Sequence, residues 1–367
     1  MVKPVVVIGG GLAGAAAATR LARQGRSVVL LEREQGPHEK VCGEFLSIEA
    51  CQHLEDLGLA PAALGAVPMD RVRLHHGHLT REAPLPFVAH GLSRKVLDEA
   101  LLETAAAAGA HVTRGVRVTG LRGATVLSSH GEHEASEILL ATGKHDLRGL
   151  PRPSPAGSKG YIGLKMHWGC SAAVLAQMEG AIELVVFDGG YAGLQRVGAR
   201  DINMCLVIRR DRFAELGSTW PSLLEHLLRE PILARRLGEA EPRMARPLAI
   251  ANLPYGFVHE PDGGDAPDVW RLGDQVAMTA SLTGDGMAIA LRSAQLAAEA
   301  LVGGANATTY HRRVAAQAGG QVRRAMRLQR AAERPWARAV GTRLVAAWPG
   351  LLTWAAQATR LPAHTTD

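Results

Sequence analysis

The sequence has few of the residues that disulfide frameworks, metal centres and nucleic-acid platforms need. Its 367 residues include only four cysteines, and no two of them form a CxxC pair. Such spacing indicates neither a disulfide framework nor a structural zinc site. Aromatic residues make up 4% of the chain, too few for a large surface on which bases stack. We therefore expect no bound metal and no nucleic-acid partner.

Long apolar runs are also missing. No stretch reaches the roughly 18 uncharged apolar residues of a membrane-spanning helix, and no cleavable leader is recognisable before the first apolar run at Val5. The net charge of +6 is unevenly placed, because residues 303–367 hold ten arginines and only two acids. The sequence thus predicts a cytoplasmic protein, either free or peripheral to a membrane.

The first 33 residues have the order of a dinucleotide-binding unit. The apolar run Val5–Ile8 predicts a buried parallel strand. It leads into a GxGxxG turn and an alanine-rich helix, and a second apolar run then ends in an acid. The turn would bring backbone N–H groups and a helix N-terminus to a pyrophosphate, and the acid would accept the ribose hydroxyls. The predicted contacts are Gly9, Gly11, Leu12, Ala13, Gly14, Glu32 and Arg33.

A segment far along the chain has a complementary pattern. A short apolar run at 269–272 ends in Gly273-Asp274, and Thr283-Gly-Asp-Gly286 then opens a long apolar helix from Met287. The aspartate would face a polyol, and the glycine-rich helix start would face an electron-poor ring. This segment predicts that the nucleotide site continues past its phosphates.

Taken in order, these segments resemble the flavoprotein superfamily of p-hydroxybenzoate hydroxylase-type monooxygenases and geranylgeranyl reductases. The resemblance implies that FAD is the cofactor, with Asp274 at its ribitol and the backbone of Gly284, Asp285, Gly286 and Met287 facing the flavin pyrimidine. Further segments match the superfamily at Gly91–Asp98, at 116–118 and at the turn Ala141-Thr142-Gly143. The resemblance implies that Arg94, Val118, Ala141, Thr142 and Gly143 also lie near FAD.

The predicted fold class is α/β. We expect a Rossmann-like FAD-binding domain of the GR2 type, an inserted and mostly antiparallel β-sheet domain for the substrate, and C-terminal helices. The FAD-binding domain is expected over 1–66, 91–150 and 265–305, the substrate domain over 67–90 and 151–264, and an arginine-rich helical segment over 306–367. This arrangement would leave an apolar cavity between sheet and flavin for a hydrophobic small molecule.

A second strand–GGxxG stretch, at 182–193, could suggest a bound nicotinamide nucleotide. Residues 195–208 after it are typical of a turn and strand, so no helix N-terminus is available for phosphates. We therefore interpret 182–208 as a hairpin. The electron donor would be NAD(P)H that binds transiently, or a partner reductase.

The stretch Lys40-Val-Cys-Gly-Glu44 resembles the geranylgeranyl-reductase branch, and the candidate catalytic residues are Cys42 and Glu44. The thiol would donate a proton and the carboxylate would tune it. The resemblance implies a reductase acting on a lipid- or polyketide-like metabolite by flavin hydride chemistry. A monooxygenase using O2 and NAD(P)H is the alternative. The DG pair that hydroxylases commonly carry before the ATG-like turn is replaced here by residues 134–137, and the halogenase WxWxIP sequence is missing. A non-catalytic FAD-binding or carrier-docking protein is an alternative of another class.

Arginines recur every three or four residues from 323 to 338, which predicts one cationic stripe on a helix. Two interpretations are open. The stripe is either the solvated face of helices packed on the FAD-binding domain, or a surface for an anionic membrane or an acidic carrier protein.

Overall fold

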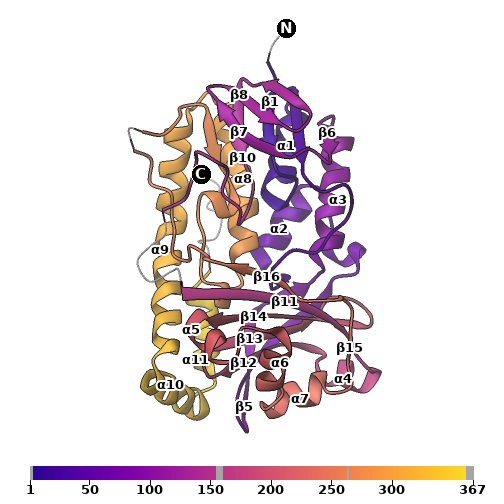
Figure 1. The fold of residues 1–367 in the computed structure, drawn as a ribbon, viewed down its shortest axis with the longest axis vertical. Coiled ribbons are helices and arrows are strands. Elements are labelled where there is room, and N and C mark those ends of the chain that lie inside the picture. Colours follow the sequence, from indigo (N-terminus) through magenta and orange to yellow (C-terminus); the bar gives the residue numbers. More distant parts are fainter. Residues whose placement is uncertain (1–2, 154–159, 263, 361–367) are drawn as a thin grey trace.

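The computed structural model describes residues 3–153, 160–262 and 264–360. Figure 1 shows a parallel sheet with its helices at one end of the molecule and a larger sheet crossing below it. The parallel sheet has five strands in the order β17 (Val269–Arg271), β10 (Glu137–Leu140), β1 (Val5–Ile8), β2 (Val28–Glu32) and β6 (His111–Arg114). The inner strands and β17 are short, apolar and buried on both faces, as expected of a parallel sheet, whereas the edge strand β6 is partly exposed.

The two faces of the parallel sheet are covered differently. Helices α1 (Leu12–Arg23), α3 (Arg94–Ala107) and α8 (Gly286–Val302) pack on one face. The other face packs against a meander of β7 (Val118–Arg122), β8 (Thr125–Ser128) and β9 (Gly131–Glu134). The strand expected around 116–118 begins only at Val118, because the backbone of Val116 bonds to Glu32 as the chain leaves β6.

The larger sheet has nine strands. Eight of them follow the order β15 (Glu241–Pro242), β11 (Tyr161–Gly169), β14 (Asp201–Arg209), β13 (Gly190–Arg196), β12 (Gly180–Phe187), β4 (Val67–His76), β5 (Leu79–Gly91) and β3 (Phe45–Leu46), and β16 (Leu248–Ala251) also pairs with β11. Only β12 and β4 pair in parallel, so the predicted mostly antiparallel sheet is confirmed. The expected hairpin is also confirmed, since β12 and β13 are joined by a tight turn at 188–189.

One boundary differs from the expected domain ranges. β3 lies within the range 1–66 expected for FAD binding, yet it pairs with β5 at the edge of the nine-stranded sheet. The CGE stretch therefore passes from the nucleotide unit directly into the larger sheet. It is followed by α2 (Ile48–Asp56) and the 3-10 turn η1 (Pro61–Leu64), and 3-10 turns η3 (Gly273–Gln275) and η4 (Ser281–Thr283) precede α8.

Helices cover the far side of the nine-stranded sheet. Apolar residues of α4 (Ala172–Gln177), α6 (Trp220–Leu227) and α7 (Pro231–Leu237), with α5 (Arg210–Glu215) beside them, share a core with the inner strands. Figure 1 shows these helices on the opposite side of the sheet from the FAD-binding end. Helices thus cover one face of the nine-stranded sheet, and its other face lies toward the nucleotide unit.

The C-terminal part consists of α9 (Ala307–Glu333), α10 (Pro335–Ala347) and α11 (Gly350–Ala358). The predicted single cationic stripe is wrong, because α9 ends at Glu333 and Arg334 is the N-cap of α10, ahead of Pro335. α9 packs along α8, while α10 and α11 pack against β5. Among the described residues, no helix is both long and apolar enough to cross a membrane. Residues 361–367 of the expected C-terminal segment lie outside the described residues.

Candidate flavin and substrate site

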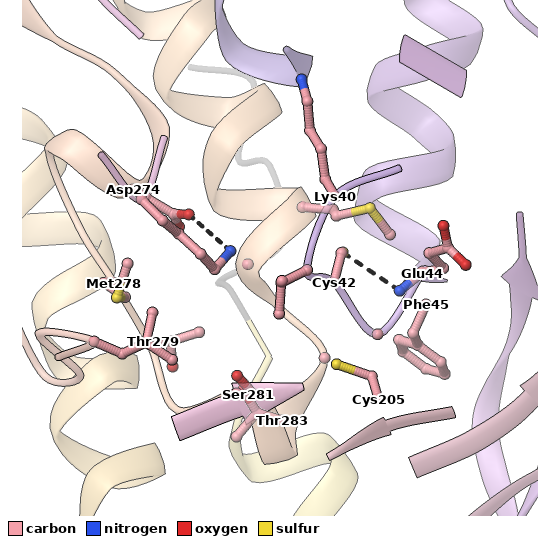
Figure 2. Close-up of a pocket in the computed structure, with 18 of the residues that line it drawn as sticks. Lys40, Cys42, Glu44, Phe45, Cys205, Asp274, Met278, Thr279, Ser281 and Thr283 are labelled. Carbon is pink, nitrogen blue, oxygen red and sulfur yellow. Dashed lines mark hydrogen bonds and ion pairs between the residues drawn. The ribbon is translucent and has the colours of Figure 1, made fainter. Parts of the chain in front are cut away.

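A single cavity of about 980 Å³ joins the nucleotide unit to the nine-stranded sheet. Figure 2 shows Cys42 and Glu44 on one side of this cavity, with Asp274 and Met278 on the other. Most of the predicted site residues line it: Gly9, Gly11, Leu12, Ala13, Glu32, Arg33, Cys42, Glu44, Arg94, Val118, Ala141, Thr142, Gly143, Gly273, Asp274, Gly284, Gly286 and Met287. The two predicted residues outside its lining are Gly14 and Asp285.

The glycines of the first turn have separate steric roles. Gly9 has a φ of +102°, and a Cβ there would lie 2.6 Å from the carbonyl oxygen of Ala141. A Cβ on Gly14 would lie 1.9 Å from the carbonyl oxygen of Gly9, so this glycine packs helix on strand. A Cβ on Gly11 would instead point at the side chains of Lys40 and Arg94. The bare backbone at Gly11 and two cations therefore converge at the start of α1, an arrangement suited to phosphates.

Glu32 is fixed at the end of β2. Its Oε2 accepts the backbone N–H of Gly10 at 2.6 Å, and its Oε1 accepts that of Glu34 at 2.9 Å. The side chain lines the cavity while being only 6% exposed. Each carboxylate oxygen keeps further acceptor capacity, which suits a ribose diol.

Arg94 begins α3 after the N-cap Ser93, whose hydroxyl accepts the backbone N–H of Lys95 as predicted. Its guanidinium makes two hydrogen bonds to the carboxylate of Asp98, at 2.7 and 2.9 Å, and Lys40 binds the same carboxylate at 2.8 Å. Burial alone would lower the pKa of Arg94, but the charges and hydrogen bonds of Asp98 and Cys42 together outweigh it and raise the pKa. Arg94 is therefore a permanently charged group beside Gly11.

Asp274 follows β17 and faces the ammonium of Lys144 at 3.1 Å. Arg152 connects the surrounding loops, since it donates to the carbonyl oxygens of Asp274 and Lys144 and to the carboxylate of Asp146. Gln275 donates to the carbonyl oxygen of Gly143, the last residue of the ATG turn. These contacts hold the two segments with Asp274 and Gly143 in one position.

The N-terminus of α8 lies at the other end of the cavity. Gly284 has a φ of +72° and contacts the ring of Phe45 closely enough that a Cβ would lie 2.6 Å from it. Asp285 points away from the cavity and is fully buried, with Arg360 at 2.8 Å from its Oδ1. Burial raises the pKa of Asp285 to about 7, although the charge of Arg360 opposes this rise. Asp285 thus ties the start of α8 to the end of α11.

Glu44 is held by a buried network in the nine-stranded sheet. Its Oε1 accepts the backbone N–H of Arg94 at 2.7 Å and lies 2.5 Å from Lys165 Nζ, while its Oε2 lies 2.6 Å from His167 Nε2. Burial would raise the pKa of Glu44, but the hydrogen bond from His167 and the charge of Lys165 lower it overall. Glu39 is the second carboxylate on Lys165, at 2.7 Å.

These contacts use both carboxylate oxygens of Glu44 to attach the CGE loop to the sheet. Glu39, Glu44 and His167 are also close enough to hold a metal ion. The ammonium of Lys165 already lies within hydrogen-bonding distance of both carboxylates and is the counter-charge that the structure shows for them. The structure therefore places Glu44 as the anchor of the loop.

Cys42 faces the cavity at the tip of this loop. Its Sγ accepts the backbone N–H of Glu44 at 3.3 Å, and its carbonyl oxygen accepts from the Asn203 amide of β14 at 3.0 Å. The thiol lies close enough to Lys144 to affect it: burial would lower the pKa of Lys144, and Asp274 and then Cys42 raise it. Cys51 lies in the core on α2, away from the cavity lining.

Three of the four tyrosines gather where the sheet faces the flavin side, and none was singled out from the sequence. Tyr161 and Tyr255 pack with ring centroids 6.0 Å apart, and the Tyr255 hydroxyl bonds to Ser281 at 2.5 Å. Among the described residues, the buried Tyr191 hydroxyl makes no hydrogen bond of good geometry, and Ser281 is the side chain that approaches it. Burial raises the pKa of Tyr191 well above its usual value, although Ser281 opposes this rise. Tyr191 lines the cavity as a protonated phenol.

Sequence reasoning missed further residues of the site, namely Lys40, Lys144, Arg152, Lys165, His167, Tyr191 and Gln275. Lys40 and Lys144 stand beside quoted motifs, so their positions were available from the sequence. Lys165 and His167 alternate along β11 and point to the same face, but no motif marks them. Tyr191 could be found only once the hairpin was placed over the nucleotide unit.

Comparison with known proteins agrees with this site. Residues 3–135 match the FAD binding domain family. Menaquinone reductase of Mycolicibacterium smegmatis is 27% identical over 327 residues, which cover 82% of this chain and 76% of that protein. Among solved structures, the flavin-dependent brominase Bmp2 has a TM-score of 0.81 at 20% identity, covering 97% of this chain and 93% of that one. PqsL of P. aeruginosa has a TM-score of 0.70 at 19% identity, covering 91% and 98%.

The fold and the site define an FAD-dependent oxidoreductase. More closely, the chain has the architecture of the flavin-dependent halogenases and monooxygenases. The residues present fit FAD, because a bare glycine turn with two cations suits its phosphates and a buried, oriented carboxylate suits its ribose.

Proposed function

We propose that this protein reduces a carbon–carbon double bond in a hydrophobic, lipid- or polyketide-like molecule, with geranylgeranyl reductase-like chemistry. The observation that supports this most is the cavity, which runs without interruption from the FAD-binding residues to an apolar wall. That wall is formed by strands of the nine-stranded sheet, through Val72, Leu74, Leu85, Phe87, Ile182, Leu184 and Val186. A polar substrate would leave its hydrogen-bonding groups unpaired there.

A similarity that spans most of the chain supports the same class of substrate. Menaquinone is a lipid-soluble quinone, and the relative named menaquinone reductase aligns with most of this chain. We infer that the nine-stranded sheet of this chain receives a molecule of comparable hydrophobicity. The cavity wall carries too few polar groups to select a small charged metabolite.

FAD, once bound and reduced, supplies hydride to the substrate. The protein must then supply the proton, and Cys42 and Tyr191 are two candidate donors among the residues that line the cavity. Cys42 lies on the nucleotide-side loop beside Lys144, whereas Tyr191 presents its phenol from β13. Glu44 and Lys165 hold the loop that carries Cys42 and take no proton themselves. We expect the electrons to come from NAD(P)H that binds transiently, or from a partner reductase.

A monooxygenase reaction is the second candidate. The observation that favours it is the shared fold with the brominase and with PqsL. In that reaction, O2 and NAD(P)H would be consumed and an oxygen atom would enter the substrate. The same apolar wall would then hold an aromatic or polyketide-like molecule.

Anaerobic reoxidation of the reduced flavin distinguishes the two reactions. The FAD-loaded protein is reduced with dithionite without oxygen, and the flavin absorbance is followed after addition of a polyprenyl substrate that carries no quinone ring. A reductase is reoxidised by substrate alone and yields a product two hydrogens heavier. If reoxidation requires O2 and the product gains oxygen, the reductase proposal is wrong and the monooxygenase is correct.

A further inference from the structure

The outer face of α10 and α11 is unusually apolar. Trp336, Val340 and Leu344 recur every four residues on α10, and Trp348, Leu351 and Trp354 continue the pattern to α11. We call these six residues the tryptophan face. Its three tryptophans are 66%, 64% and 61% exposed, although tryptophan is usually among the most buried residues. A contiguous exposed apolar patch of this kind marks an interaction surface.

The charges near the tryptophan face are mostly positive. From residue 323 to 360 the sequence contains eight arginines and one acid, Glu333. Arg330, Arg334 and Arg343 are exposed close to the tryptophan face along the chain. Trp and Arg together are typical of helices that lie in the headgroup region of a bilayer, where indole rings and guanidinium groups both find partners. The positive charge favours anionic lipids in particular.

The same two helices form a wall of the substrate cavity. Their inner face is made mainly of small and aliphatic residues, with Arg338 among them: Ala337, Arg338, Gly341, Thr342, Val345, Leu352, Ala355 and Ala356. They are attached to β5 by two hydrogen bonds, from Arg81 to the carbonyl oxygen of Ala346 and from Thr353 to that of Pro84. Only one layer of helix therefore separates the tryptophan face from the cavity.

We propose that the tryptophan face docks the protein on an anionic lipid bilayer, with α10 and α11 lying in the headgroup region. Figure 1 shows α10 at the end of the molecule remote from the parallel sheet, so docking leaves the nucleotide unit in water. A hydrophobic substrate dissolved in the bilayer then meets the wall of the cavity directly. That consequence rests on the proposed function, whereas the docking itself does not depend on which flavin reaction occurs.

Vesicle binding of the full FAD-loaded chain tests the docking without any turnover. Vesicles of equal parts phosphatidylglycerol and phosphatidylcholine are sedimented with the protein, and vesicles of phosphatidylcholine alone are compared. We expect binding to the anionic vesicles, a blue shift of tryptophan emission, and weaker binding at 1 M salt. The variant carrying Trp336→Ser and Trp348→Ser should bind at least about tenfold more weakly, because two large apolar contacts are lost.

The matched control removes exposed apolar residues elsewhere. Val96 on α3 and Val302 at the end of α8 are 43% and 48% exposed, so Val96→Ser with Val302→Ser should bind vesicles like the wild type. Bound FAD and an unchanged melting temperature show that each variant is folded. If the double tryptophan variant fails this check, Trp354→Ser alone serves instead.

Three results would overturn the docking proposal. The first is wild-type protein that does not sediment with either vesicle. The second is equal binding by the wild type and the folded tryptophan variant. The third is a wild-type dimer in light scattering that the tryptophan variant converts to monomers without any vesicle binding, since a second copy would then cover the face.

Discussion

The ammonium of Lys165 lies 2.5 Å from the Oε1 of Glu44, and both side chains are fully buried. This ion pair joins the middle of β11 to a loop whose backbone is unusual at that point, since Glu44 has a φ of +60°. A side chain other than glycine in the left-handed region persists only where its surroundings hold it there. The network around Glu44 therefore sets the position of Cys42, two residues away, relative to the cavity.

Replacing Lys165 with methionine should destabilise the protein strongly. The carboxylates of Glu39 and Glu44 would be left facing each other in the interior without their cation. Removing one partner of a buried ion pair costs about 3–5 kcal/mol. Urea unfolding measures this loss. Lys3→Met breaks the exposed pair with Glu134 and should cost less than about 1 kcal/mol. Equal losses for the two variants would contradict the anchoring role of Lys165.

The nucleotide unit could be predicted from sequence because its information is local. Gly9, Gly11, Glu32 and Asp274 each occur in a strand–turn pattern that dictates backbone geometry, and the structure brings all four to one cavity. The mostly antiparallel sheet was expected because residues 67–90 and 151–264 are rich in strand-forming segments and because the resemblance implies such an insertion.

The rest of the site depends on contacts that span the chain. Lys165 meets Glu44 across 121 residues, and Arg360 meets Asp285 across 75. No local pattern encodes such pairs, because each requires the docking of one sheet or helix on another. The cationic stripe failed for a similar reason, since Pro335 starts a new helix within an otherwise regular arginine repeat.

Gly11→Ala should weaken FAD binding while leaving the fold intact. The new Cβ would lie 3.3 Å from Lys40 Nζ and 3.6 Å from Arg94, and the flexible lysine side chain can move. It would nonetheless cover the backbone that approaches the phosphates, so we expect at least about tenfold weaker binding. Flavin titration of the apoprotein measures this. Gly36→Ala meets open space and is the control. Unchanged affinity in Gly11→Ala would show that this turn does not bind the phosphates of FAD.

Cys42→Ala should retain FAD and lose most turnover, because the thiol is a candidate proton donor on the cavity wall. Loss of a general acid typically costs about 10²–10⁴ in rate. Stopped-flow reoxidation by substrate separates this step from flavin reduction, which should be unaffected. Cys51→Ala removes a thiol from the core beside the same loop and should react at the wild-type rate. Full turnover in Cys42→Ala would show that the Cys42 thiol is not a proton donor and has only a packing role.

Tyr191→Phe tests whether Tyr191, the second candidate proton donor, takes part in the reaction. If this phenol binds the substrate or supplies its proton, kcat should fall at least about tenfold with little change in unfolding free energy. Tyr310→Phe is the matched control, since that phenol donates to the Arg271 carbonyl oxygen at 2.8 Å outside the cavity. The control should lose about 1 kcal/mol of stability and keep its activity. The opposite pattern would exclude Tyr191 from the reaction.

Asp285 should make the protein less stable as pH rises from about 4 to about 7. Its carboxyl has a pKa of about 7 in the folded protein, raised by burial, against 3.8 for the ordinary group. Within this window the folded state keeps a proton that the unfolded state has released, so unfolding becomes easier with increasing pH. The loss amounts to roughly 4 kcal/mol, at about 1.4 kcal/mol per pKa unit.

Asp285→Asn removes the titrating group, so its stability relative to the wild type should increase across the same window. Urea unfolding at pH 4.5, 6 and 8 measures the difference, and Asp70→Asn on the exposed end of β4 should run parallel to the wild type. Arg360→Met should move the wild-type transition to higher pH, because the opposing charge of Arg360 is lost. Parallel curves for Asp285→Asn and wild type would show that Asp285 is ionised throughout. The effect of the Arg360 charge on the pKa of Asp285 would then exceed the effect of burial.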